Sequence, residues 1–205
     1  MSATSIVGFA GSASIPSKTR ALVEEISARA ASRFGVSHTV YDILDFAGSL
    51  GNARRIDDLD AKARAALDDI LNAQALVIAT PVYKGSYPGL FKHLIDLIDP
   101  AALAGKPILL AATGGGDKHA LIVEHQLRPL FAFFEAQTLG TGVYASDRDF
   151  QDGKLVNPAI LERIDRAIGQ FETHLAPGRR DDFIRAAGAT VHQIRPLAES
   201  AAAGR

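Results

Sequence analysis

The sequence predicts an α/β domain in which a five-stranded parallel sheet lies between two layers of helices. Two observations predict this class. Short apolar runs alternate with helical patterns along the chain, and a polar loop follows each of the strongest runs. Such alternation implies right-handed crossovers, which place helices on both faces of a parallel sheet. A chain of 205 residues, 47% of them hydrophobic and 22% charged, suits one domain with a sizeable core.

The predicted strands read as continuously apolar runs. Residues 5–10, 75–80 and 107–112 are SIVGFA, ALVIAT and PILLAA, as expected for strands covered on both faces. Residues 36–42 are more mixed and predict an edge strand. Residues 137–145 predict a fifth strand, which is weaker because it contains glycines.

Apolar residues at helical spacing predict the two outer layers. They recur in two segments, at Leu22, Val23, Ile26, Ala30 and Phe34, and at Leu90, Phe91, Leu94, Ile95 and Ile98. Further helices fit residues 58–72, 117–135 and 157–174. After Ala176 the pattern breaks, so we expect residues 1–177 to form the domain. Residues 178–205 then form a C-terminal tail, either partly disordered or packed on a neighbouring subunit.

Charge and composition exclude several classes of partner. The formal net charge is -1 and basic residues alternate with acidic ones, so we expect neither a nucleic acid nor a membrane as partner. Cysteine is absent, which excludes disulfides and thiolate metal sites, and we expect no metal. The first residues lack the basic region of a signal peptide, and no uncharged apolar stretch reaches the roughly 18 residues of a membrane span. We expect a cytoplasmic protein.

The loop after the first strand is rich in hydroxyl groups. Residues 8–22 read GFAGSASIPSKTRAL and lead into a helix that begins near Ser17. The hydroxyl side chains around this helix start are those of Ser12, Ser14, Ser17 and Thr19. A helix start carries unpaired N–H groups and about half a positive charge, so hydroxyls and amides together can hold a phosphate. The alternative is a single helix cap within an ordinary loop, and Lys18 either adds charge or points to solvent.

The glycines of this loop help to choose between phosphate classes. Neither the G-x-x-x-x-G-K-[ST] loop of nucleoside triphosphate sites nor the dinucleotide pattern is present. Gly8 and Gly11 are three residues apart, but Ser14 stands where the third glycine of the dinucleotide pattern would be. Hydroxyls in place of glycines favour a terminal monophosphate, as in FMN.

Two further loops follow the other strong strands. Residues 80–97, TPVYKGSYPGLFKHLIDL, combine stiffening prolines with Tyr83 and Tyr87, which suits a planar ring; a turn with two surface tyrosines is the alternative. Residues 113–119, TGGGDKH, expose successive amides that can donate to ring carbonyls. The phenylalanines of 127–137 predict either core packing or an interface between subunits. In an open parallel sheet the carboxyl ends of the strands share one edge, so we expect the three loops to converge there.

Four motifs together resemble a known family. They are GSASIPSKTRAL, TPVYKGSYPGLFKHLIDLI, KPILLAATGGGDKHALIVEHQLRPLF and GVYASDRDF. In this order they resemble the flavodoxin-like NAD(P)H-dependent FMN reductases, above all those that supply reduced flavin to alkanesulfonate or methanesulfonate monooxygenases. The resemblance covers roughly residues 4–175 and implies a flavodoxin-like three-layer sandwich. The sequence departs from the family pattern at two places. Many relatives have GSPR where this chain has GSAS, and some sulfonate-type members have a tyrosine where this chain has His125.

The resemblance assigns roles to individual residues. It implies that the FMN phosphate is held by Ser12, Ser14, Ser17, Lys18 and Thr19. The isoalloxazine would be bordered by Pro81, Val82, Tyr83 and Lys84, with Ser86 nearby, and its pyrimidine side would meet Thr113, Gly114, Gly115 and Gly116. No residue is assigned as certainly catalytic; Lys84 and His119 are candidates for helping at the nicotinamide phosphate or the flavin edge.

The activity implied is that of an NAD(P)H:FMN oxidoreductase, which uses NADPH or NADH to reduce FMN for a partner FMNH2-dependent monooxygenase. The resemblance also implies a homodimer or homotetramer. Two alternatives remain open. One is a quinone, azo or chromate reductase that retains its FMN, and the other is a flavodoxin-like electron carrier, against which the net charge of -1 counts.

Overall fold

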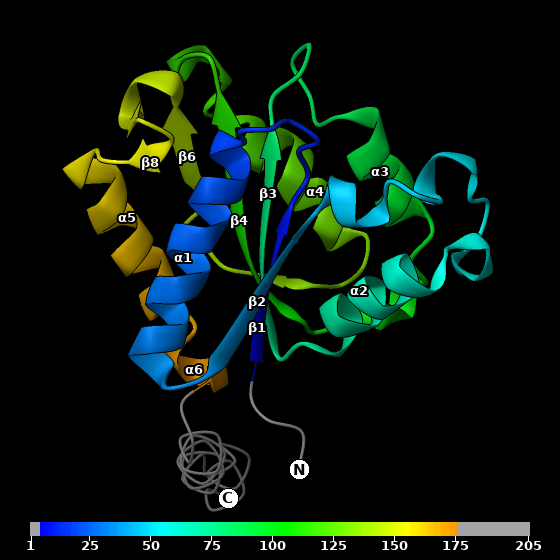
Figure 1. Cartoon of the computed structure of the whole chain (residues 1–205). Coiled ribbons are helices and arrows are strands. Elements are labelled where there is room, and N and C mark those ends of the chain that lie inside the picture. The colour runs from blue at the N-terminus through cyan, green and yellow to red at the C-terminus, as the bar shows by residue number, and fades with distance from the viewer. Residues whose placement is uncertain (1–4, 176–205) are drawn as a thin grey trace, which may run out of the picture. The chain divides into compact units, whose positions relative to one another are not determined.

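The computed structural model describes residues 5–175, so the predicted tail of 178–205 lies outside the described residues. A parallel sheet in the strand order β2-β1-β3-β4-β5 forms the centre, and β6 also pairs with β4 (Figure 1). Its strands are β1 Ser5–Ala10, β2 Ser37–Asp42, β3 Ala75–Pro81, β4 Pro107–Gly114, β5 Gln137–Thr138 and β6 Val143–Ser146. A small antiparallel pair, β7 Phe150–Gln151 and β8 Lys154–Leu155, follows. The predicted parallel α/β sandwich is therefore confirmed.

The fifth strand predicted over 137–145 is split in two. β5 pairs with the start of β4, where Pro107 lies opposite Gln137, whereas β6 pairs with its end. Between them, residues 139–142 leave the sheet, and the side chain of Gln170 accepts from the N–H of Thr141 at 3.1 Å. Gly140 and Gly142 in this stretch add no side chain to sheet packing, so the chain departs from the sheet at low cost.

Helices cover both faces of the sheet (Figure 1). Alternate residues of the strands point to opposite faces, so Ile6 packs with α1 and α5 while Phe9 packs with α2 and α3. The helices are α1 Lys18–Phe34, α2 Ala61–Asn72, α3 Gly89–Asp96, α4 Arg128–Ala132, α5 Pro158–Gly169 and α6 Glu172–Leu175. Short 3-10 helices span Ile43–Phe46, Leu50–Asn52, Ile56–Asp58, Pro100–Leu103, Asp117–His119 and Asp147–Asp149.

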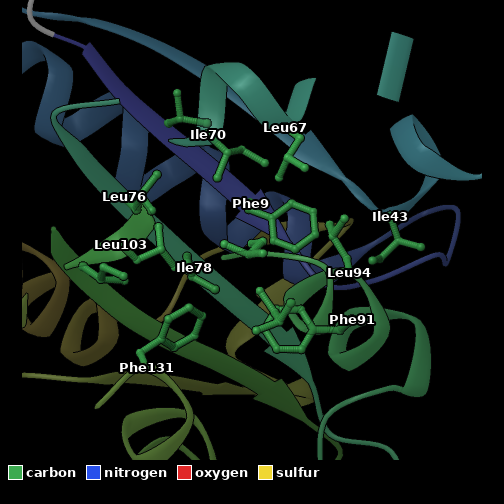
Figure 2. Close-up of a cluster of buried hydrophobic side chains, with 14 of the residues drawn as sticks. Phe9, Ile43, Leu67, Ile70, Leu76, Ile78, Phe91, Leu94, Leu103 and Phe131 are labelled. Carbon is green, nitrogen blue, oxygen red and sulfur yellow. The ribbon is translucent and has the colours of Figure 1, made fainter. Parts of the chain in front are cut away.

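The core between the sheet and α2, α3 and α4 is built around aromatic rings. Phe9 of β1 stacks on Phe91 of α3 with 5.9 Å between ring centroids, and Phe46 meets Phe9 edge-on. Figure 2 shows these phenylalanine rings of β1 and α3 beside aliphatic side chains from α2 and β3. This packing fixes the carboxyl ends of β1 and β3, where the polar loops begin.

The prediction of a single helix over residues 117–135 is wrong. The structure has a 3-10 turn, then a π-helix over Val123–Leu127, then the short α4. Pro129 cannot donate a backbone hydrogen bond, and the N–H of Arg128 reaches back to the carbonyl of Val123, the π spacing. Phe131 and Phe134 are buried in the core, whereas Phe133 is exposed, so the phenylalanines divide between core and surface.

Within residues 5–175 the structure has neither a helix long and apolar enough to cross a membrane nor a cluster of potential metal ligands.

Candidate functional site

A pocket of about 410 Å³ lies at the carboxyl ends of β1, β3 and β4. The strand order reverses between β1 and β3, and ligands of open parallel sheets bind at such a point. The lining residues come from five separate segments of the chain: Ser12, Ser14, Pro16, Ser17, Lys18, Thr19, Pro81, Val82, Tyr83, Thr113, Gly114, Gly115, Asp147 and Gly153. The three loops expected to converge therefore do so.

The first loop presents hydrogen-bond donors at the start of α1. Ser17 caps the helix, because its Oγ accepts from the N–H of Arg20 at 3.1 Å. The preceding N–H groups, of Lys18 and Thr19, have no acceptor within the helix. Ser12 is buried and its Oγ accepts from the N–H of Ser14 at 3.2 Å, which orders the loop. Amides and hydroxyl protons therefore meet at the positive end of a helix, which is an arrangement that binds anions.

Thr19 also makes a hydrogen bond that connects two of the loops. Its Oγ1 lies 2.7 Å from Oγ1 of Thr113, and both side chains are buried. This hydrogen bond ties the start of α1 to the end of β4. The first and third loops are thereby held in fixed register beside the pocket.

The second loop leaves β3 and forms a tight turn. The backbones of Tyr83 and Ser86 exchange two hydrogen bonds, at 2.8 and 3.1 Å, and Lys84 occupies the turn with a φ of 52°. The Tyr83 hydroxyl lies 3.0 Å from Oγ of Ser14 and so joins the second loop to the first. Pro81, Val82 and Tyr83 line the pocket.

The third loop contributes backbone more than side chains. Gly114 and Gly115 line the pocket, and the Tyr144 hydroxyl donates to the carbonyl of Gly116 at 2.6 Å. Burial raises the pKa of Tyr144, so the phenol remains a donor. A Cβ on Gly114 would lie 2.6 Å from that hydroxyl oxygen, which explains why a glycine stands there. Tyr144 thus positions this loop. The pattern of apolar residues in the sequence did not predict this role.

The structure does not bring every predicted residue into the pocket. Lys84, Ser86, Gly116 and His119 lie outside its lining. Ser86 Oγ instead donates to the side chain of Gln126 at 3.2 Å.

Sequence reasoning missed Pro16, Asp147 and Gly153, which also line the pocket. Asp147 directly follows β6 at the same sheet edge as the three loops, and it pairs with Lys18 at 2.8 Å. Its position after a strand, within the motif GVYASDRDF, was the signal that could have found it.

The geometry fits FMN, a flat ring joined by a sugar-alcohol chain to a phosphate. One part of the pocket offers uncharged donors around the α1 start, and another part is bordered by Val82, Tyr83 and the glycine loop. The family model described as NADPH-dependent FMN reductase matches residues 4–151. The chain belongs to the NADPH-dependent FMN reductase family. The matched range includes all the loops that carry predicted site residues.

Individual members of this family are similar over most of the chain. The "NADH-dependent FMN reductase SfnF" of Pseudomonas fluorescens is 44% identical over 176 residues, which is 84% of this chain and 94% of the relative. A solved NADH:FMN oxidoreductase (EMOB), in its apo form, is 30% identical with a TM-score of 0.70, covering 85% of this chain and 91% of that one. Oxidised Flavodoxin 1 from Bacillus cereus has a TM-score of 0.56 at 15% identity, over 84% of this chain and all of that one, which shows the flavodoxin-like fold alone.

Proposed function

We propose that this protein is an NAD(P)H:FMN oxidoreductase that supplies reduced FMN to a partner monooxygenase of the alkanesulfonate or methanesulfonate type. The observation that carries the proposal is the single pocket in which phosphate donors and ring-bordering loops meet, in a member of the FMN reductase family. NADPH and NADH are both candidate donors. With no cysteine and no helix in residues 5–175 that could cross a membrane, we place the reaction in the cytoplasm.

The proposed binding roles follow from the contacts. The hydroxyls of Ser12, Ser14 and Ser17, with the first amides of α1, hold the phosphate, and Lys18 lies at the rim. Val82 and Tyr83 border the ring, while Gly114 and Gly115 contribute amides to its pyrimidine side.

When bound, FMN accepts a hydride from the nicotinamide, and this chemistry requires no acid or base from the protein. The contribution of the chain is to position donors before the reaction. The Thr19–Thr113 and Tyr144–Gly116 hydrogen bonds hold the third loop in place, so its amides can stabilise negative charge without rearranging. Lys84 and His119, both outside the pocket lining, act at most at its periphery.

The proposal is tested by flavin binding and by turnover. Ser12, Ser14 and Ser17, changed together to alanine, should weaken FMN binding much more than riboflavin binding, because riboflavin lacks the phosphate. Ser32→Ala, on the exposed surface of α1, is the matched control and should bind both flavins as before. Calorimetry measures the affinities. Equal losses for both flavins would contradict the phosphate assignment.

Turnover separates the proposed enzyme from its alternatives. We expect the protein to consume NADPH or NADH when free FMN is added, measured as the loss of absorbance at 340 nm. If neither nicotinamide is consumed, the reductase proposal is wrong and an electron carrier is favoured. FMN should also be lost on desalting. A protein that stays yellow would favour a quinone, azo or chromate reductase that retains its flavin.

We further propose that residues 1–177 form the flavin-binding domain and that it assembles as a homodimer or homotetramer. Exposed apolar side chains in α3 and in the segments before and after α4 support this: Leu90 is 45% exposed, Leu121 63% and Phe133 69%. Phe133→Ser should lower the mass measured by light scattering in solution. An unchanged mass would place the subunit contact elsewhere.

A further inference from the structure

Two side chains of opposite charge line the pocket. Within the described part of the chain, Lys18 and Asp147 are the charged residues of its lining; the remaining lining side chains are neutral. The charge of the pocket walls therefore sums to zero. A phosphate carries about -1.5 to -2 charges near neutral pH, so the pocket walls supply no net positive charge to balance it.

Lys18 and Asp147 contact each other directly. Nζ of Lys18 lies 2.8 Å from Oδ1 of Asp147, and the two side chains are 43% and 62% exposed. Lys18 opens α1 and Asp147 follows β6, so the pair joins two loops at the rim of the pocket. The neighbouring Arg148 turns away to Asp117 at 2.5 Å and does not line the pocket, so it adds no compensating positive charge there.

We propose that Asp147 is an affinity-limiting residue for the flavin phosphate. Its carboxylate engages the one cation of the pocket wall and adds a negative charge beside the phosphate donors. This inference rests on the proposed function and deepens it, because it explains how the same site can bind FMN and then release it. A flavin held by neutral hydroxyls and amides, with the nearby lysine already paired, leaves more readily than one clamped by a free cation.

The expected effect is moderate because both groups are partly exposed. Solvent screens charges at such a rim, so removing the carboxylate changes phosphate affinity by about tenfold rather than thousandfold. The effect is confined to ligands that carry a phosphate.

The experiment compares Asp147→Asn with the natural chain, using FMN and riboflavin as paired ligands. The amide keeps the shape of the side chain and removes its charge. FMN affinity, measured by quenching of flavin fluorescence, should rise about tenfold, and the FMN dissociation rate should fall by a similar factor. Riboflavin affinity should stay within about twofold, and the gain for FMN should shrink at high salt.

The matched control is Asp165→Asn. Asp165 also pairs with a basic residue of α1, because Nη1 of Arg29 lies 3.1 Å from its Oδ1, and its side chain is 56% exposed. It is not among the residues that line the pocket. This variant has the same change in net charge as Asp147→Asn, and its FMN affinity should match that of the natural chain.

A double-mutant cycle tests whether Lys18 is the partner through which Asp147 acts. Lys18→Met should lower FMN affinity more in the Asp147→Asn chain than in the natural chain, because only the former leaves the ammonium free for the phosphate. Equal losses in both chains would overturn this part of the inference.

The inference fails separately from the proposed function. If the natural chain reduces FMN but Asp147→Asn leaves its affinity unchanged, or raises riboflavin affinity equally, the role of Asp147 is overturned and the reductase stands. If the natural chain neither binds nor reduces FMN, both are overturned together.

Discussion

Two segments that follow strands of the sheet, α1 and residues 117–134, look alike in sequence but differ in structure. Each comes after a buried strand and a polar loop, and each buries apolar residues at helical spacing. Yet α1 is one helix of 17 residues, whereas the other segment is a 3-10 turn, a π-helix and a short α-helix.

The caps of α1 and a proline inside the second segment explain the difference. α1 begins at the Ser17 cap and ends at Gly35, whose left-handed conformation lets its N–H bond back to Ala31. The second segment contains Pro129, which removes one backbone donor. Apolar spacing thus predicts which residues are buried, but capping and proline decide whether the helix is continuous.

Arg128 compensates for the break. Its guanidinium bonds Glu124, the hydroxyl of Thr138 and the carbonyl of Leu139, so one side chain links the π-helix to the chain between β5 and β6. The second segment depends on this tertiary clamp, while α1 depends on its caps.

The largest expected effect concerns the glycines beneath the two segments. A Cβ on Gly8 would lie 2.4 Å from Val23 Cγ1, 2.7 Å from Ser27 Oγ and 3.1 Å from Val40 Cγ2. Gly8→Ala should therefore lower the free energy of unfolding by about 2 kcal/mol, measured by urea denaturation.

Gly142→Ala is the matched change below the second segment. There the added Cβ would meet Val123 Cγ1 at 2.5 Å, and the next atom, Glu124 Oε1, is 3.5 Å away. With one close neighbour instead of three, the cost should be about 1 kcal/mol. A larger loss than for Gly8→Ala would contradict the expectation that the number of close neighbours decides the cost.

Removal of the Arg128 side-chain contacts should have an effect between those of the two glycine substitutions. Arg128→Met leaves the acceptors on Glu124 and Leu139 without their donor, and we expect a loss of about 1.5 kcal/mol in urea denaturation. Arg29→Met, on α1, removes the ion pairs with Glu25 of α1 and Asp165 of α5, which are partly exposed to solvent, and should cost about 0.5 kcal/mol. If both variants lose the same free energy of unfolding, the second segment does not depend on Arg128 more than α1 depends on Arg29.

The cap of α1 should contribute about 1 kcal/mol, measured without flavin. Ser17→Ala removes the acceptor for the Arg20 N–H, while Ser17→Thr keeps a hydroxyl and should recover most of the loss. Thermal unfolding compares the two variants. If threonine fails to rescue the helix, the capping interpretation is wrong.

The smallest expected effect is on pH dependence. The hydrogen bond from Arg128 lowers the pKa of Glu124 against the opposing effect of burial. A carboxyl with a lowered folded-state pKa stabilises the fold above its unfolded value of about 4.3, and loses that contribution as pH falls through the folded pKa. Glu124→Gln should therefore flatten the acid side of the stability profile below about pH 5, leaving the profile near pH 7 unchanged in shape. An unchanged acid limb would contradict this.

Most of the fold could be predicted from local patterns, because continuously apolar runs such as 75–80 leave few alternatives to a buried parallel strand. The split between β5 and β6 could not be predicted in this way, because the contacts of residues 139–142 come from distant parts of the sequence: Gln170 accepts from Thr141, and Val123 packs against Gly142. The same holds for the π-helix, whose tertiary clamp reaches Thr138 and Leu139.

The candidate site was predictable where residue types signal it. Ser12, Ser14 and Ser17 were found because hydroxyls gather at a helix start, and the structure places all three in the pocket lining. Asp147 and Tyr144 were not found. Asp147 reaches the pocket from a different loop, where it pairs with Lys18, and Tyr144 acts on the carbonyl of Gly116. Side chains that act across loops leave no periodic signal.

The interruption between β5 and β6 also affects how the molecule behaves toward copies of itself. An exposed sheet edge can template the addition of a strand from another chain, which is a route to aggregation. Here the edge beyond β4 consists of a two-residue and a four-residue strand separated by an excursion, so it offers an incoming chain no long ladder of free backbone groups. The stretch whose glycines weakened the strand prediction thus limits intermolecular β-pairing at this edge of the sheet.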